Sequence, residues 1–137
     1  MNLYLASSSQ HDALSLAKVL VSAGHVITSS WVYKPLKRTS EYTDDQRTAI
    51  AVRNLSDITA SDVLILLGNR FLCPGGKHVE VGYALGVGKP VWVLGPRENL
   101  LLWHPGVRWF EHLNDLLTHL RAVRDQIEAP HMKPKWN

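Results

Sequence analysis

One five-residue run limits what this chain can fold into more than any other feature. Val63–Leu67 is apolar at every position, whereas a strand with one face in water alternates apolar and polar residues. A strand that is apolar on both faces belongs at the centre of a parallel sheet covered by helices. The run therefore predicts an α/β fold.

Strand-like and helix-like segments alternate through the rest of the chain. Strands are expected at 3–6, 25–32, 63–67, 90–94 and 107–110, with helices at 10–23, 43–60 and 77–87 and a last helix marked by the apolar stripe from Leu113 to Ile127. Ser9 and Thr43 are suited to cap the first two helices, and Gly24 suits the end of the first. The alternation predicts one doubly wound, Rossmann-like or flavodoxin-like three-layer sandwich with about five parallel strands.

The length and composition fit one domain. The chain has 137 residues and one cysteine, which excludes a disulfide framework and a multi-cysteine metal site. No apolar run approaches the roughly 20 residues that cross a bilayer, and the N-terminus resembles no secretory signal. We expect a cytoplasmic α/β domain over residues 1–128 and a flexible tail over 129–137, where two prolines and two lysines gather.

The basic character of the chain is concentrated at its end. Residues 121–137 carry a net charge of +2 out of the total of +3. Nucleic-acid binding proteins instead show a clustered basic face, so we expect no nucleic-acid polymer and no membrane as a partner.

Ligands of doubly wound folds bind at the carboxyl ends of the strands. Three segments should meet there: residues 6–10, 68–80 and 95–99. Glu80 is expected in the first turn of the helix that follows the central strand. A helix N-terminus alone favours an acidic residue there, but an ionised carboxylate beside a cleft is also what attack on an anomeric carbon requires.

Three stretches together resemble the nucleoside 2-deoxyribosyltransferase family, which includes 2'-deoxynucleoside 5'-phosphate N-hydrolases. They are Tyr4-Leu5-Ala6-Ser7, Ala60-Ser61-Asp62-Val63-Leu64, and Gly76-x3-Glu80-x-Gly82-Tyr83-Ala84-x4-Lys89-Pro90-Val91. The resemblance implies N-glycosidic bond cleavage in a (deoxy)nucleoside or nucleoside monophosphate. Glu80 matches the nucleophile that forms a glycosyl-enzyme, which water or a second base resolves.

The resemblance also implies the surroundings of the nucleophile. Tyr4 matches a first-strand tyrosine that orients it, although the position also suits an ordinary strand aromatic. The residues expected to bind substrate are Ala6, Ser7, Ser8, Asn54, Gly76, His78 and Asn99. Ser7–Ser9 replace a glycine-containing turn and could equally serve only to form the turn and cap the helix. Members of the family complete each active site with a neighbouring subunit, so we expect a homodimer or higher homo-oligomer.

Two departures from the family pattern bear on mechanism. The aspartate that helps protonate the base is replaced by Asn54, and an amide cannot supply a proton. A helical wheel with Ala51, Leu55 and Ile58 on the buried face turns Asp57 away from that face and Asp44 toward it. Asp44 is therefore the preferred substitute acid, and His78 is the other candidate.

The second departure concerns phosphate. The nucleotide hydrolases carry an arginine and a serine where this chain has Gln10 and Pro74. Lys77, Arg97 or the serine turn could compensate, and the sequence slightly favours a nucleoside or an unusual nucleotide.

Two other functions remain open. Pro74-Gly75-Gly76 followed by a glutamate also resembles the phosphoribohydrolases that activate cytokinins, but only three residues separate it from Glu80 here and the Gly-Thr pair is missing. A nucleotide-sensing module without turnover is the second alternative. No cofactor is implied, and the spacing of the seven histidines gives little support for a metal site.

Overall fold

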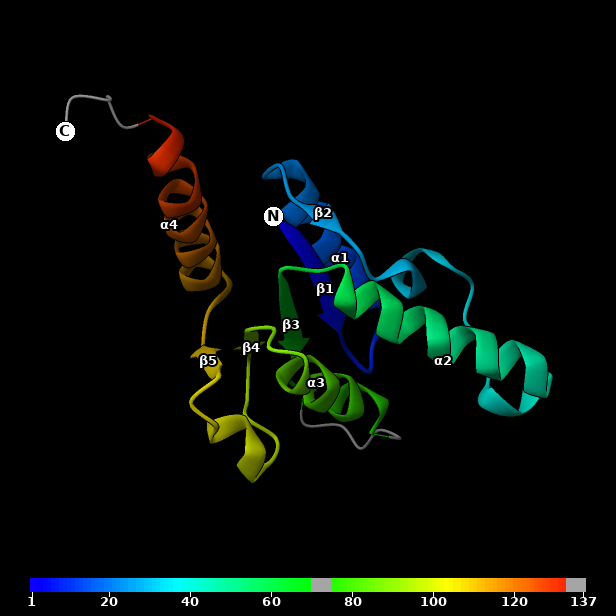
Figure 1. Ribbon diagram of the computed structural model, residues 1–137. Coiled ribbons are helices and arrows are strands. Elements are labelled where there is room, and N and C mark those ends of the chain that lie inside the picture. The colour runs from blue at the N-terminus through cyan, green and yellow to red at the C-terminus, as the bar shows by residue number, and fades with distance from the viewer. Residues whose placement is uncertain (70–74, 133–137) are drawn as a thin grey trace.

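A computed structural model describes residues 1–69 and 75–132 of the chain, and side chains as far as residue 126. Its strands form one parallel sheet in the order β2-β1-β3-β4-β5 (Figure 1). The strands are β1 (Asn2–Ala6), β2 (Val26–Ile27), β3 (Val63–Leu67), β4 (Val91–Leu94) and β5 (Val107–Phe110). The chain first runs outward from β1 to β2 and then returns to add β3 on the other side of β1. The switch point of the topology therefore lies between β1 and β3.

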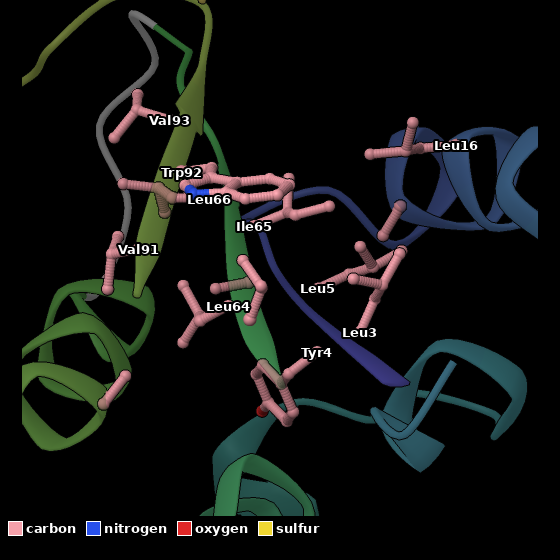
Figure 2. Packing of buried hydrophobic residues seen from close by; sticks show 14 of the residues in the cluster. Leu3, Tyr4, Leu5, Leu16, Leu64, Ile65, Leu66, Val91, Trp92 and Val93 are labelled. Carbon is pink, nitrogen blue, oxygen red and sulfur yellow. The ribbon is translucent and has the colours of Figure 1, made fainter. Parts of the chain in front are cut away.

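Helices cover both faces of this sheet. They are α1 (Gln10–Ser22), α2 (Asp44–Thr59), α3 (Gly76–Gly86) and α4 (Leu113–Met132). Leu5, Ile65 and Trp92 are in register and share one face, where the Trp92 ring contacts His119 of α4. Tyr4 lies on the opposite face, toward α2 and α3, and Figure 2 shows it apart from Leu3 and Leu5. The predicted three-layer α/β fold is confirmed.

The segment after α1 differs from the prediction. A strand was expected over 25–32, but only Val26–Ile27 pair with β1, and Ser30–Tyr33 form the short 3-10 helix η1. Side chains replace the missing backbone pairing: the Leu5 amide donates to Ser29 Oγ (3.0 Å), and the Trp31 indole donates to the Leu5 carbonyl (2.9 Å). The strand prediction failed because these contacts satisfy the backbone hydrogen-bonding groups of β1, so no longer partner strand is needed.

The two predicted N-terminal caps are present. Ser9 Oγ accepts from the Asp12 amide of α1, and Thr43 and Gln46 form a reciprocal capping box at α2. Two further 3-10 helices, η2 (Thr39–Glu41) and η3 (Leu100–Trp103), lie where no strand or helix was expected. Both N-terminal helix boundaries could therefore be read from the sequence.

The C-terminal helix extends beyond the predicted domain boundary. Its backbone includes residues 129–132, which we had expected in the tail, and residues 133–137 lie outside the described part. Leu116 and Leu120 of the predicted apolar stripe are buried. Across the described ranges, no helix has both the length and the hydrophobicity needed to cross a bilayer.

Candidate active site

Tyr4 and Glu80 meet on the α2–α3 face of the sheet, beside the switch point. Tyr4 is completely buried in the middle of β1, and its hydroxyl donates a hydrogen bond to Glu80 Oε2. Helix α3, which carries Glu80, starts one residue earlier than predicted. Glu80 is therefore its fifth residue and not part of the first turn. The preference of acidic residues for a helix N-terminus therefore does not explain Glu80, because that effect fades beyond the first turn.

Burial controls the electrostatics of this pair. Loss of solvation raises the pKa of Glu80 to about 7, and the hydrogen bond from Tyr4 opposes that rise. Burial, followed by the negative charge of Glu80, raises the pKa of the Tyr4 phenol well above its ordinary value. Tyr4 therefore remains a donor near neutral pH, while Glu80 can exchange between its acid and its carboxylate.

The turn after β1 joins the two strands at the switch point. Ser7 Oγ accepts from the Ser9 amide (3.0 Å), which closes the turn. Ser8 Oγ accepts from the Asn69 side-chain amide (2.5 Å), just beyond β3. Ala6, at the end of β1, is buried. Ser7 thus closes the turn, and Ser8 connects it to the segment that follows β3.

A buried ion pair ties the start of α3 to the loop after β4. Lys77 Nζ lies 2.6 Å from Glu98 Oε1, and the Lys77 side chain is only 1% exposed. The Asn69 backbone amide donates to the same oxygen (2.7 Å). Burial acts against ionisation of Glu98, but these donors hold its pKa below the ordinary value. Lys77 is therefore already neutralised and does not supply the missing phosphate-binding charge.

His78 is fixed between two partners of the same cluster. Asn99 Oδ1 accepts from the Leu101 amide (3.0 Å), so its amide nitrogen faces His78 Nδ1 (3.2 Å). Nδ1 must then accept, which places the imidazole proton on Nε2, 3.4 Å from Glu98 Oε2. This arrangement uses His78 to position the loop after β4 and offers no proton to a leaving base.

The first-loop residue Gln10 has a structural role. Its side-chain amide donates to the carbonyls of Trp31 (3.0 Å), Val32 (3.2 Å) and Lys34 (2.5 Å), and so holds η1 against α1. A groove of about 500 Å³ runs along this contact, but Tyr4 and Glu80 do not line it. Gln10 therefore does not stand in for the family's arginine.

Arg97 is held at the far side of the sheet. Its guanidinium stacks between the rings of Trp103 (4.7 Å) and Trp109 (5.0 Å). Trp109 belongs to the edge strand β5, with β3 and β4 between it and Tyr4. The stacking fixes Arg97 away from the switch point, so neither cation considered in the sequence restores the family's phosphate contact there.

Leu55 and Ile58 of α2 face the core as predicted, but the predicted placement of Asp44 and Asp57 was wrong. Asp44 lies on the surface: its side chain is 96% exposed and its carboxylate accepts from Arg47 (2.5 Å). Ala51 is exposed, whereas Asp57 is half-buried and accepts from the Ser30 amide (3.1 Å) and hydroxyl (2.7 Å). The wheel failed because α2 buries only Ile58 completely, so few apolar positions define its inner face.

Arg53 was missed in the sequence. It is half-buried on α2, and its Nη2 donates to the adjacent Asn54 Oδ1 (3.4 Å). Its Nε is buried and has no partner in the described part of the chain. Its positive charge opposes the rise in the Tyr4 pKa, and its contact with Asn54 places it on the part of α2 that the family resemblance assigns to the base. The available signal was a basic residue directly beside the position where the family has its aspartate.

The remaining predicted residues lie at the start of α3. Gly76 is the first helical residue, preceded by Gly75 with a φ of +88°, which favours glycine. Cys73 and Pro74 lie outside the described residues. The structure thus brings Tyr4, Glu80 and the serine turn to the switch point, and excludes Asp44 from it.

Comparison with known proteins now bears on this site. The family model described as nucleoside 2-deoxyribosyltransferase matches residues 3–121. The chain belongs to this family. The resemblance identified in the sequence is confirmed, and the match includes both Tyr4 and Glu80. A search of curated protein sequences gives no match.

Two solved structures resemble this member of the nucleoside 2-deoxyribosyltransferase family. A 2-deoxyribosyltransferase from Bacillus psychrosaccharolyticus is 25% identical, with a TM-score of 0.69 over 85% of this chain and 90% of the other. The CMP N-glycosidase BcmB of Clostridium botulinum is 19% identical, with a TM-score of 0.59 over 89% of this chain and 99% of the other. The second likeness is one of fold.

Proposed function

We propose that this protein cleaves the N-glycosidic bond of a (deoxy)nucleoside or nucleoside monophosphate by double displacement. A Glu80 oxygen forms a bond to C1' while the bond from C1' to the base nitrogen breaks, and the base leaves with the bonding electrons. Water or a second base then attacks C1' and releases Glu80. Water makes the protein a hydrolase, and a second base makes it a transferase.

The contact between Tyr4 and Glu80 carries this proposal. A nucleophilic carboxylate must be held in one orientation and must be ionised when it attacks. The Tyr4 hydroxyl supplies the orientation, and a pKa of about 7 leaves a substantial ionised fraction at neutral pH. Partial desolvation also keeps the carboxylate reactive, because water no longer stabilises its charge.

Substrate binding is assigned to the carboxyl edge around this pair. We expect the sugar and base to contact residues from the serine turn, α2, the start of α3 and the loop after β4: Ala6, Ser7, Ser8, Asn54, Gly76 and Asn99. Because Gln10 holds η1 and Lys77 is paired with Glu98, a nucleoside is favoured over a standard 5'-monophosphate.

Release of free base from a panel of nucleosides, deoxynucleosides and their 5'-monophosphates tests the proposal. We expect Glu80→Gln to lose at least about 1,000-fold in kcat, while the exposed control Glu111→Gln keeps full activity. A nucleoside with fluorine at C2' of the sugar should trap the glycosyl-enzyme, and mass spectrometry should place the added sugar on Glu80. An unchanged panel, or full activity in Glu80→Gln, would contradict the mechanism.

The pH profile tests the role of Tyr4. Because Glu80 must be ionised, kcat/KM of the wild type should rise with pH through about 7. The hydrogen bond from Tyr4 lowers that pKa, so Tyr4→Phe should move the rise to higher pH. A profile that keeps its midpoint in Tyr4→Phe would remove Tyr4 from the mechanism.

We also propose that the protein is a homodimer or larger homo-oligomer. Leu100, Leu101 and Trp103 of η3 are strongly exposed, directly after Asn99, and exposed apolar groups of this kind favour association. Light scattering should give at least twice the chain mass of 15.4 kDa, and Leu101→Glu should shift it toward the monomer. A monomeric wild type at micromolar concentration would contradict this proposal.

A further inference from the structure

The proposed bond cleavage leaves an electron pair on the departing base. Either a proton donor or a positive charge must stabilise it. Among the described residues near the pair, Asp57 accepts two hydrogen bonds from Ser30, and the proton of His78 faces Glu98. Asn54 is an amide. No proton donor other than Tyr4, which is engaged with Glu80, is poised in the described part of this site.

Arg53 is placed to supply positive charge instead. It makes no ion pair with any described residue, and its one hydrogen bond goes to Asn54 (3.4 Å). Its buried Nε has no partner among the described residues, which is costly for a guanidinium unless a ligand completes its hydrogen bonding. Asp57, one helical turn later on the same face, is held by Ser30. Arg53 therefore places guanidinium donors beside Asn54, the position at which the family pattern has its aspartate.

Arg47, six residues earlier on α2, provides the contrast. It donates to the Asp44 carboxylate (2.5 Å) and to the Thr39 carbonyl (2.9 Å), and the second bond anchors η2 to α2. The two arginines thus share a helix and a charge, but only Arg53 lacks a carboxylate partner and affects the pKa of Tyr4. Arg47 is consequently a matched control for removal of positive charge from α2.

We propose that Arg53 binds the departing base and stabilises it as an anion, in place of the missing proton donor. This inference rests on the proposed function. The electrons of the broken bond go to the base nitrogen and spread to the adjacent carbonyl oxygen, which accepts from the guanidinium. The base takes its proton from water after it leaves.

The chemistry of the guanidinium selects the substrate class. Arginine has donors and no acceptor, so it suits bases that present carbonyl oxygens beside the glycosidic nitrogen and delocalise negative charge onto them. The 2,4-diketo pyrimidines, such as uracil and thymine, meet both conditions. Cytosine has the same 2-carbonyl beside its glycosidic nitrogen, but its 4-amino group makes its anion less stable than that of a diketo pyrimidine. Adenine presents no carbonyl, and both bases leave readily only after protonation. Nucleosides of the diketo pyrimidines are therefore the expected substrates.

The dependence of kcat/KM on the stability of the departing base tests this role of Arg53. We expect Arg53→Met to lose about 100-fold in kcat/KM on deoxyuridine but less than 10-fold on 5-fluorodeoxyuridine, whose base forms a more stable anion. Arg53→Lys should recover part of the loss, and Arg47→Met should match the wild type on both substrates. Equal losses on the two substrates, or a loss confined to 5'-monophosphates, would overturn the proposal.

A binding experiment separates this inference from the proposed function. Ultraviolet titration of bound 5-fluorouracil reports its ionisation without any turnover. We expect binding to wild type, Glu80→Gln and Arg47→Met to lower the pKa of the base, and binding to Arg53→Met to leave it near its value in water. If no nucleoside is cleaved, this shift alone still decides the role of Arg53. Absence of binding, or an equal shift in Arg53→Met, overturns it.

Discussion

Helices α1 and α2 cover opposite faces of the same sheet but are held there in different ways. α1 buries Ala13, Leu16, Ala17 and Leu20 in 13 residues, whereas α2 buries only Ile58 completely in 16. Figure 1 shows α2 extending beyond the sheet. Its position depends on the capping box and on polar contacts such as Asp57 with Ser30 and Thr59 with Tyr83 (2.9 Å).

Because of this difference, the helix that buries more apolar side chains, α1, is not the helix beside the candidate site, α2. Burial of apolar side chains fixes α1 against the sheet. The α2 side gives up part of that stabilisation, and Arg53, Asn54 and Asp57 line it instead. The candidate site lies on the face covered by the helix with fewer fully buried side chains.

The largest expected effect is at the α1 contact. Leu20→Ala should lower the free energy of unfolding by about 3 kcal/mol, because Leu20 is fully buried and leaves a cavity. Leu55→Ala, in the half-buried part of α2, should lower it by only about 1 kcal/mol. Urea denaturation followed by circular dichroism measures both. Equal losses would refute the contrast between the two helices.

The second effect arises from the site itself. The pKa of Glu80 is about 7 in the folded protein and 4.5 ordinarily, so the folded state holds its proton more tightly. Stability should therefore fall as pH rises from about 4.5 to 7, by up to about 3 kcal/mol. Glu80→Gln should remove this fall and be more stable than wild type at pH 8. Parallel pH profiles for the two proteins would contradict the burial of this charge.

A smaller loss is expected at the polar anchor of α2. Asp57→Ala removes both hydrogen bonds to Ser30 and should lower the free energy of unfolding by about 2 kcal/mol. The exposed first-turn control Asp45→Ala should change it by less than about 1 kcal/mol. Amide hydrogen exchange should show faster exchange in η1 only for Asp57→Ala. No difference between the variants would mean that η1 is held by its apolar contacts.

The smallest effect is at the helix cap. Thr43→Ala removes the side chain that accepts from the Gln46 amide and should cost about 1 kcal/mol. Because α2 has little apolar anchoring, we expect the loss to appear as fraying of its first turns. Hydrogen exchange in residues 44–48 checks this. Substitution of the exposed Val52 by Ser is the neutral reference.

The contrast also explains which predictions from sequence succeeded. The strand at Val63–Leu67 and helix α1 were predicted correctly because dense apolar patterns record burial directly. The pairing of Tyr4 with Glu80 could be anticipated only through the family resemblance, since 76 residues separate them.

The failures lie where polar contacts determine the structure. The strand expected over 25–32 gave way to η1 because Ser29 and Trp31 side chains bond to the backbone of Leu5. The orientation of Asp44 and Asp57 was reversed, and Arg53 was overlooked, because a helix with one fully buried residue has no clear apolar face. Such contacts carry no periodic signal in a single sequence.

The backbones that leave β3 and β4 touch at two glycines, which limits how this protein can be redesigned. A Cβ on Gly68 would lie 2.2 Å from the Pro96 carbonyl oxygen, and one on Gly95 would lie 2.8 Å from the Gly68 carbonyl oxygen. Variant libraries aimed at new substrates should therefore keep both glycines invariant. Diversity belongs at α2 positions such as Asn54, where altered side chains leave the junction between these strands intact.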